Sequence, residues 1–240
     1  FKFRDATKKL RKQRLQRRWP NLDLPVEAYG GELPFEPVMV EHQLVDPTQR
    51  WSLLRRCNVD PTVHPVWRFK GGEQAALARW QAFKEKGLNG YARRRNNAAD
   101  ANGVSRMSAY IHYGMISPMK IAREAAEVGT KSAEKYLDEL LVFREHPWHH
   151  IYATPEPYGV HNLPEWARLS WRSTADDPRT TRYTLRQLQR GEVHDPLWAA
   201  CQRSLLRHGE LHNNVRMTWG KALTLWTDDV EQSMAYGQAL

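Results

Sequence analysis

The sequence predicts an all-α fold. Apolar residues recur at helical spacing in several segments, and residues that start and stop helices flank those segments. No part of the chain shows the alternation of a strand-forming domain. With 240 residues, of which 41% are hydrophobic, the chain is long enough to form one large domain with a buried core.

The clearest helical pattern lies in residues 194–226 and predicts two helices joined by a tight turn. Asp195 is a good N-cap, and Pro196 stands at a first helical position, where a missing N–H is tolerated. Apolar residues follow at helical spacing until Gly209 breaks the pattern, and a second helix is expected from about Asn213.

Three tryptophans of this segment are candidates for a functional role. Trp219 and Trp226 lie on one face of the second helix, roughly 10 Å apart along its axis. Trp198 of the first helix meets them if the two helices pack as an antiparallel hairpin. Indoles in a row pack in a core more often than they carry electrons, so the spacing alone favours a structural role.

Further helices are expected at residues 73–86, 118–128 and 133–146, and one more near Ser105 and Ser108. The N-terminal part has a different character. Residues 2–18 contain nine lysines and arginines, which could contact DNA phosphates, although a solvated helix or linker is the commoner use of such a run.

Residues 19–50 are rich in proline and poor in periodicity, as is typical of a connector. We therefore expect a connector with a basic N-terminal run at residues 1–59 and a helical domain at residues 60–240.

The formal net charge of +9 favours a polyanionic partner, and a basic protein without a nucleic-acid role is an equally good interpretation. Cys57 and Cys201 are the only cysteines, which indicates neither a disulfide framework nor a zinc site. A reducing compartment is expected, the cytoplasm or, in a eukaryote, the nucleus. No apolar run approaches 18 residues, so no transmembrane helix is expected. The start at Phe1, without a Met, indicates an excerpt of a longer protein.

Ser105 and Ser108 lie at an expected helix start. Free backbone N–H groups and the positive end of the helix dipole attract anions there, and hydroxyl groups add donors without adding charge. Serines at such positions act more often as helix caps, so the physical argument alone favours capping over binding of a pyrophosphate.

Tyr136, Glu139 (or Leu140) and Phe143 share a face of the helix expected at residues 133–146. A carboxylate between two aromatic side chains would be partly desolvated, and an exposed surface glutamate is the ordinary alternative. Nearby histidines suggest a metal site, but no second ligand cluster supports one and no metal is expected. These histidines are His146, His149 and His150.

Together these motifs resemble the flavin-binding helical domain of class II cyclobutane-pyrimidine-dimer photolyases, in the photolyase and cryptochrome family. Three stretches share sequence motifs with this family. They are HDPLW, HGxxH and RMxW in residues 194–219, GYxxxRN from Gly90, and GVSRMSAYIHYGMISP from Gly103 to Pro118. In the last motif, Met107 and Tyr113 replace the family's Leu and Phe, and Ala109 stands where Pro is usual. The resemblance covers residues 60–240.

The resemblance implies an FAD cofactor and a set of site residues. The expected FAD contacts are Tyr91, Ser105, Arg106, Met107, Ser108, Tyr136 and Arg216, with the phosphates at the two serines. The expected contacts to DNA and lesion are Arg95, Asn96, Phe143, Asn213, Asn214 and Met217. Class II enzymes usually have Trp at the position of Phe143. Glu139 is expected to contact the dimer, and Trp219, Trp198 and Trp226 to form the photoreduction relay in an order that the sequence leaves open.

The expected function is light-driven repair of cyclobutane pyrimidine dimers in double-stranded DNA by electron transfer from reduced FAD, by a monomeric enzyme. A cryptochrome-like blue-light photoreceptor without repair activity is the alternative, favoured by Phe143. A basic helical DNA-binding module without cofactor is a third. Relatives carry an N-terminal α/β antenna domain, with a possible antenna pigment, and a C-terminal segment at the flavin. Neither is present in these 240 residues.

Overall fold

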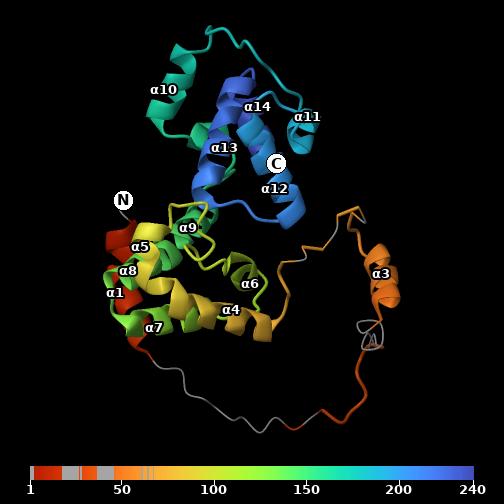
Figure 1. Cartoon of the computed structure of the whole chain (residues 1–240), viewed down its shortest axis with the longest axis vertical. Helices are drawn as coiled ribbons and strands as arrows, with labels where there is room; N and C mark the ends of the chain where they lie inside the picture. Colours follow the sequence, from red (N-terminus) through yellow and green to blue (C-terminus); the bar gives the residue numbers. More distant parts are fainter. Residues whose placement is uncertain are drawn as a thin grey trace. The chain divides into compact units, whose positions relative to one another are not determined.

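The computed structural model describes residues 3–17, 27, 29–36, 46–60, 62–63, 65–66 and 68–240 (Figure 1). The described residues of 1–17 and of 68–240 form one compact unit, and those of 18–67 form a second one that contains α3 (Pro47–Arg56). Throughout these ranges every regular element is helical. The predicted all-α fold is confirmed.

The first unit begins with α1 and continues with the helices that follow residue 68. They are α1 (Phe3–Gln16), α4 (Glu73–Lys86), a 3-10 turn (Leu88–Gly90), α5 (Tyr91–Arg94), α6 (Ser108–His112), α7 (Pro118–Val128), α8 (Lys131–Asp138), a π-helical turn (Glu139–Phe143), α9 (Glu145–Ala153), a 3-10 turn (Val160–Asn162), α10 (Glu165–Ser173), α11 (Leu185–Arg190), α12 (Pro196–His208), α13 (Asn213–Trp226) and α14 (Val230–Ala239).

The predicted hairpin at residues 194–226 is confirmed as α12 and α13. The Asp195 carboxylate accepts hydrogen bonds from the backbone N–H groups of Leu197 and Trp198, at 2.9 and 3.0 Å. Gly209 ends α12 with a φ of 59°, in the left-handed region where a side chain would be strained. The sequence therefore specifies both ends of α12 locally.

The helix expected at residues 133–146 is interrupted in the structure. α8 ends at Asp138, and a π-helical turn follows in which the Arg144 N–H donates to the Glu139 carbonyl at 3.0 Å. The extra residue in this turn rotates the following side chains around the helix axis. Tyr136 is therefore buried and Phe143 is 52% exposed, so these two residues do not share one face as expected.

The basic segment at residues 2–18 was expected to be a solvated helix or a linker. Its described part is α1, which packs against α7 and the π-helical turn. Leu15 contacts the hydrophobic core, because residues at every fourth position form one stripe along the helix. Residues 3–17 thus group with residues 68–240, in contrast to the expected boundary at residue 59.

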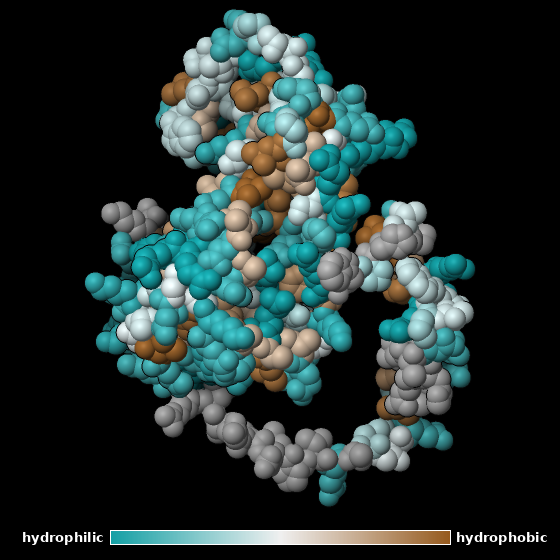
Figure 2. All heavy atoms as spheres, in the orientation of Figure 1, coloured by the Kyte–Doolittle hydropathy of each residue, from teal (hydrophilic) through white to brown (hydrophobic). Residues whose placement is uncertain are grey.

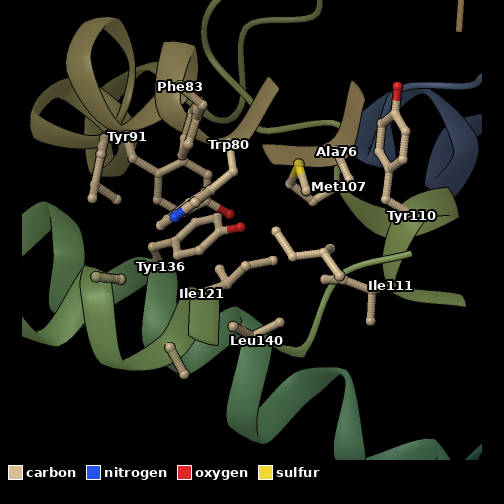
Figure 3. Close-up of a cluster of buried hydrophobic side chains, with 14 of the residues drawn as sticks. Ala76, Trp80, Phe83, Tyr91, Met107, Tyr110, Ile111, Ile121, Tyr136 and Leu140 are labelled. Atoms are coloured by element: carbon tan, nitrogen blue, oxygen red, sulfur yellow. The ribbon is translucent and has the colours of Figure 1, made fainter. Parts of the chain in front are cut away.

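The first hydrophobic core lies among α4, α5, α7, α8 and the π-helical turn (Figure 3). Trp80 stacks on Tyr136 with ring centroids 5.7 Å apart, and Phe83 and Tyr91 pack against Tyr136 at 5.5 and 5.1 Å. Figure 2 shows that hydrophilic residues cover most of the face over these helices. Burial of these aromatic rings is the main force that holds this part together.

The second hydrophobic core lies among α11, α12, α13 and α14. Its buried members are Leu188, Trp198, Trp219, Leu223 and Trp226. All three tryptophans of the hairpin are therefore core residues, whether or not they have another function.

Glu124 of α7 ties α4 to α7. Its carboxylate accepts from the indole N–H of the buried Trp80 at 2.8 Å and pairs with Lys84 at 2.7 Å and Lys120 at 2.8 Å. Partial burial on its own raises the pKa of Glu124. The hydrogen bonds from Lys120, Lys84 and Trp80 together outweigh burial and lower the pKa to about 2.

We expect Glu124→Gln to lower the free energy of unfolding at pH 7 by about 1–2 kcal/mol, because the amide loses both ion pairs in a half-exposed setting. The folded pKa lies below the unfolded value near 4.5. The carboxylate therefore stabilises the fold above about pH 4.5, and this contribution is lost as the pH falls towards 2. Urea unfolding should show a smaller difference between the two proteins at pH 3 than at pH 7.

The matched control is Glu127→Gln, which removes an exposed carboxylate from the same helix. It should change the free energy of unfolding by less than about 0.5 kcal/mol. An equal loss for Glu124→Gln at both pH values would contradict the ion-pair explanation.

Candidate functional site

Two contacts join the first core region to the α12–α13 hairpin. The Arg106 guanidinium pairs with Glu210 at 2.8 Å, which links the loop before α6 to the turn between α12 and α13. The Asn214 side-chain amide donates to the Asn96 carbonyl at 3.2 Å. Three sequence-predicted site residues from separate segments, Asn96, Arg106 and Asn214, therefore meet at this junction, together with Glu210.

A cavity of about 300 Å³ lies at the junction. Its walls include Asn96, Asn214, Thr218 and Trp219. The Trp219 indole N–H is buried and has no hydrogen-bond partner within the described part of the chain. A buried donor without an acceptor is costly, so this group is available to a ligand.

The three indoles of the hairpin form a continuous file that starts at the cavity. Trp219 stacks on Trp198 with ring centroids 5.4 Å apart and an angle of 8° between the planes. Trp198 contacts Trp226 edge-on at 5.5 Å, and its N–H donates to the Trp219 carbonyl at 2.9 Å. The order left open by the sequence is therefore Trp219, Trp198, Trp226 in space. All three are at most 8% exposed.

The sequence analysis did not single out Tyr183 and His194, which cover the outer end of this file. The Tyr183 ring contacts Trp226 edge-on at 5.2 Å, and its hydroxyl is hydrogen-bonded to Nδ1 of the exposed His194. The HDPLW motif contains His194, but nothing in the sequence pairs it with Tyr183. The contact depends on how the segment before α11 folds back onto α13.

Of the two serines expected to bind phosphate, Ser105 lies in the loop before α6 and Ser108 is the first residue of α6. α6 has only five residues and no side-chain cap, so the alternative of two capping serines is not what the structure shows. Ser105 instead accepts a hydrogen bond from the Tyr136 hydroxyl at 3.1 Å. Burial raises the pKa of Tyr136, which keeps this hydroxyl protonated as a donor. Ser108 is exposed.

Other residues that the resemblance assigned to the cofactor lie elsewhere. Tyr91 is 7% exposed within the first core, and burial raises its pKa. Met107 is 1% exposed, so its side chain fills the core and only its backbone belongs to the loop. Arg216 is exposed and donates to the Asn213 side chain at 2.8 Å, on a part of α13 that does not line the cavity. Met217, which was expected to contact DNA or the lesion, is exposed as well.

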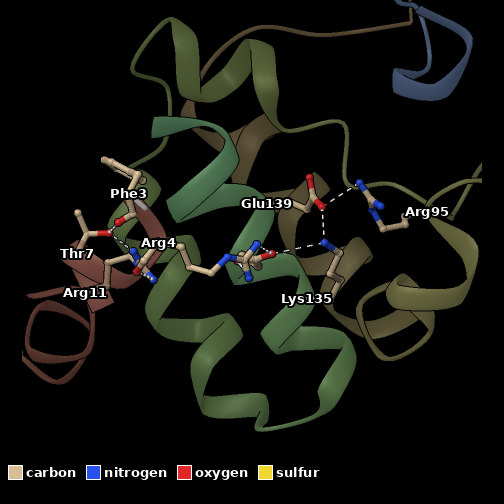
Figure 4. Close-up of polar contacts among 8 residues, drawn as sticks. Phe3, Arg4, Thr7, Arg11, Arg95, Lys135 and Glu139 are labelled. Atoms are coloured by element: carbon tan, nitrogen blue, oxygen red, sulfur yellow. Dashed lines mark hydrogen bonds and ion pairs between the residues drawn. The ribbon is translucent and has the colours of Figure 1, made fainter. Parts of the chain in front are cut away.

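Glu139 lies in a cluster of charges (Figure 4). The exposed Phe143 lies beside this cluster. One of its carboxylate oxygens pairs with Arg95 at 2.9 Å and with Lys135 at 2.7 Å. The Lys135 ammonium lies 5.3 Å from the centre of the Phe143 ring. Glu139 is therefore ion-paired, and its side chain is 23% exposed, so it is partly buried and not the fully exposed surface glutamate of the alternative.

The described residues contain neither a membrane-spanning helix nor a cluster of metal ligands. None of the described helices is long and apolar enough to cross a membrane. Within the same ranges, no three histidine, cysteine or carboxylate side chains are grouped so that they could hold a metal ion.

Comparisons with known proteins place this geometry in context. No protein-family model matches the chain. It is 36% identical over 172 residues to a deoxyribodipyrimidine photo-lyase of Methanothermobacter thermautotrophicus, which covers 72% of this chain and 38% of that protein. It is 33% identical over 226 residues to the enzyme of the same name from Arabidopsis thaliana, covering 90% of this chain and 43% of that protein.

A similar protein from Oryza sativa has the same name, with 31% identity over 220 residues, 88% of this chain and 44% of the relative. Among solved structures, a bacterial class III photolyase from Agrobacterium tumefaciens matches 71% of this chain and 38% of its own with a TM-score of 0.52. At 23% identity, that structure supports the fold alone.

The chain spans about two fifths of the length of these curated relatives, because the matched region is 38 to 44% of each relative's sequence. Neither the relatives' shared name nor the solved structure assigns it to class II. The similarity extends over most of the chain and includes the helical fold. We conclude that the chain belongs to the photolyase family.

Proposed function

We propose that this chain is the helical part of an enzyme that uses light to repair cyclobutane pyrimidine dimers in double-stranded DNA, with reduced FAD as the electron donor. The observation that carries the proposal is the file of three buried indoles that begins at a cavity. The shared name of the curated relatives supports it. A core needs buried indoles, but it does not need them in ring contact from a cavity wall outwards.

The residues at the junction fit part of an FAD molecule. The cavity of about 300 Å³ is at the lower end of the range for small-molecule sites, about 300–1,000 Å³, and suits a ring system better than a whole dinucleotide. The unpartnered Trp219 N–H and the Asn96 and Asn214 amides offer polar contacts there. Ser105 and the Arg106 guanidinium would hold the phosphates. When bound, reduced FAD supplies the light-excited electron that opens the dimer.

In this proposal the indole file restores the reduced state of the cofactor. Electrons from a one-electron reductant in solution would enter at Trp226 and pass to Trp198 and then to Trp219, each step between indoles crossing rings in contact. Trp198 and Trp219 both line the cavity, and apolar side chains of the second core pack against the other side of the path. Tyr183 and His194 lie where the path reaches the surface.

In this proposal the surface that contacts DNA includes Glu139, Arg95 and Lys135. Photolyases are among the enzymes that extrude their target nucleotides from the duplex. The exposed Phe143 ring offers a surface on which an extruded base can stack, and the two cations can bind phosphate groups. Once the phosphates engage these cations, the Glu139 carboxyl group is released to contact the dimer.

The direct test is a light-dependent repair assay on an oligonucleotide that contains a thymine dimer, with the flavin-loaded protein. We expect repair in blue light and none in the dark. Flavin absorbance without repair would favour the photoreceptor alternative. Protein that stays colourless after incubation with excess flavin would leave only a DNA-binding module.

For the indole file, we expect Trp198→Phe to remove most of the photoreduction rate, because Trp198 is the contact between the other two indoles. Repair by chemically pre-reduced protein should stay near normal. Transient absorbance and the repair assay measure the two quantities separately. The control is Trp166→Phe, at a tryptophan that is 74% exposed on α10. Equal loss of photoreduction and repair would count against a relay.

For the carboxylate, we expect Glu139→Gln to lower the yield of repair per absorbed photon several-fold, while flavin absorbance is retained. Binding of undamaged DNA should become tighter, because Arg95 and Lys135 lose their anionic partner. Glu134→Gln, on the exposed face of α8, is the matched control. An unchanged repair yield would show that Glu139 is only a surface carboxylate.

A further inference from the structure

The N-terminal helix α1 presents a basic face that the site described above does not use. A half-buried stripe of Phe3, Thr7, Arg11 and Leu15 faces the body of the unit, and the positions next to it are exposed. The helix carries six cationic side chains and a single acidic one, Asp5. The cationic residues are Arg4, Lys8, Lys9, Arg11, Lys12 and Arg14.

Arg4 anchors α1 directly beside the charge cluster at Glu139. Its guanidinium forms two parallel contacts with the Asp138 carboxylate, at 2.8 and 2.9 Å (Figure 4). It also lies 5.6 Å from the centre of the Phe143 ring, which Lys135 approaches at 5.3 Å. Phe143 is thus flanked by one cation from α1 and one from α8.

Lys8 and Lys12 continue the line that Arg4 begins. Residues four apart lie about 6 Å apart on one side of a helix, so these three cations form a row that leads away from Phe143. Both lysines are exposed, and within the described part of the chain neither forms an ion pair. Lys8 and Lys12 are not needed to hold α1 in place, because the half-buried stripe and the Arg4–Asp138 ion pair do that.

We infer that the row of Arg4, Lys8 and Lys12 binds the phosphate backbone of duplex DNA beside the extruded dimer. The inference rests on the proposed function and extends its DNA-binding surface onto α1. Two observations favour duplex DNA: the row is continuous with the Phe143 site, and its charge is complementary to a phosphate backbone. Phosphate contacts of this kind position the duplex without reading its sequence.

The test compares two double variants that each remove two positive charges. Lys8→Gln/Lys12→Gln changes the row, and Arg186→Gln/Lys221→Gln changes exposed cations on α11 and α13. Affinity for a fluorescent 20-base-pair duplex is measured over a series of salt concentrations. Each phosphate contact contributes about −0.9 to the slope of log K against log salt. The slope of the α1 variant should therefore be less negative than that of the unmodified protein by about 1.8. The control variant should keep the slope of the unmodified protein.

Thermal unfolding of both variants confirms that the fold is intact, which is expected because all four side chains are exposed. If the α1 variant keeps the original slope while the unmodified protein binds duplex DNA, the inference is overturned and the proposed function stands. If the unmodified protein does not bind duplex DNA, both fail. Weaker binding to anionic lipid vesicles with an unchanged DNA slope would assign the row to a membrane surface and would also overturn the inference.

Discussion

The stack of Trp198 on Trp219 is the interaction on which the second half of the helical unit depends. It closes the α12–α13 hairpin across the Gly209 turn, and the Trp198 N–H also donates to the Trp219 carbonyl. An aromatic pair of this kind contributes about 0.5–1.5 kcal/mol beyond the burial of its surface. The same stack forms a wall of the cavity, so packing and the proposed electron path share one pair of side chains.

The charge cluster around Phe143 serves a different purpose from the aromatic cores. It joins three cations, Arg4, Lys135 and Arg95, to the carboxylates of Asp138 and Glu139. Half-exposed ion pairs contribute little to stability, because water and salt screen them. The cluster holds three cations against two carboxylates, with one positive charge in excess, and in the proposed function a phosphate backbone displaces these carboxylates.

The junction departs from good local geometry at two points. Arg106 has a φ of 57°, which is uncommon for a residue with a side chain, and the buried Trp219 N–H has no hydrogen-bond partner among the described residues. Such costs persist where the surrounding structure or a ligand compensates for them. Both lie next to the cavity or to the loop proposed for the cofactor, which agrees with a binding role for this region.

Local rules allowed much of the fold to be derived from the sequence. Asp195 and Gly209 mark the two ends of α12, because the Asp195 carboxylate accepts from free N–H groups and Gly209 adopts a positive φ without strain. The resemblance also pointed to the tryptophans of the hairpin. Only tertiary structure decided their order, the ion pairs of Glu139, and the packing of α1 onto a segment more than a hundred residues away. Spacing along a chain reports which residues share a helix face, whereas contacts between helices depend on how those faces are packed.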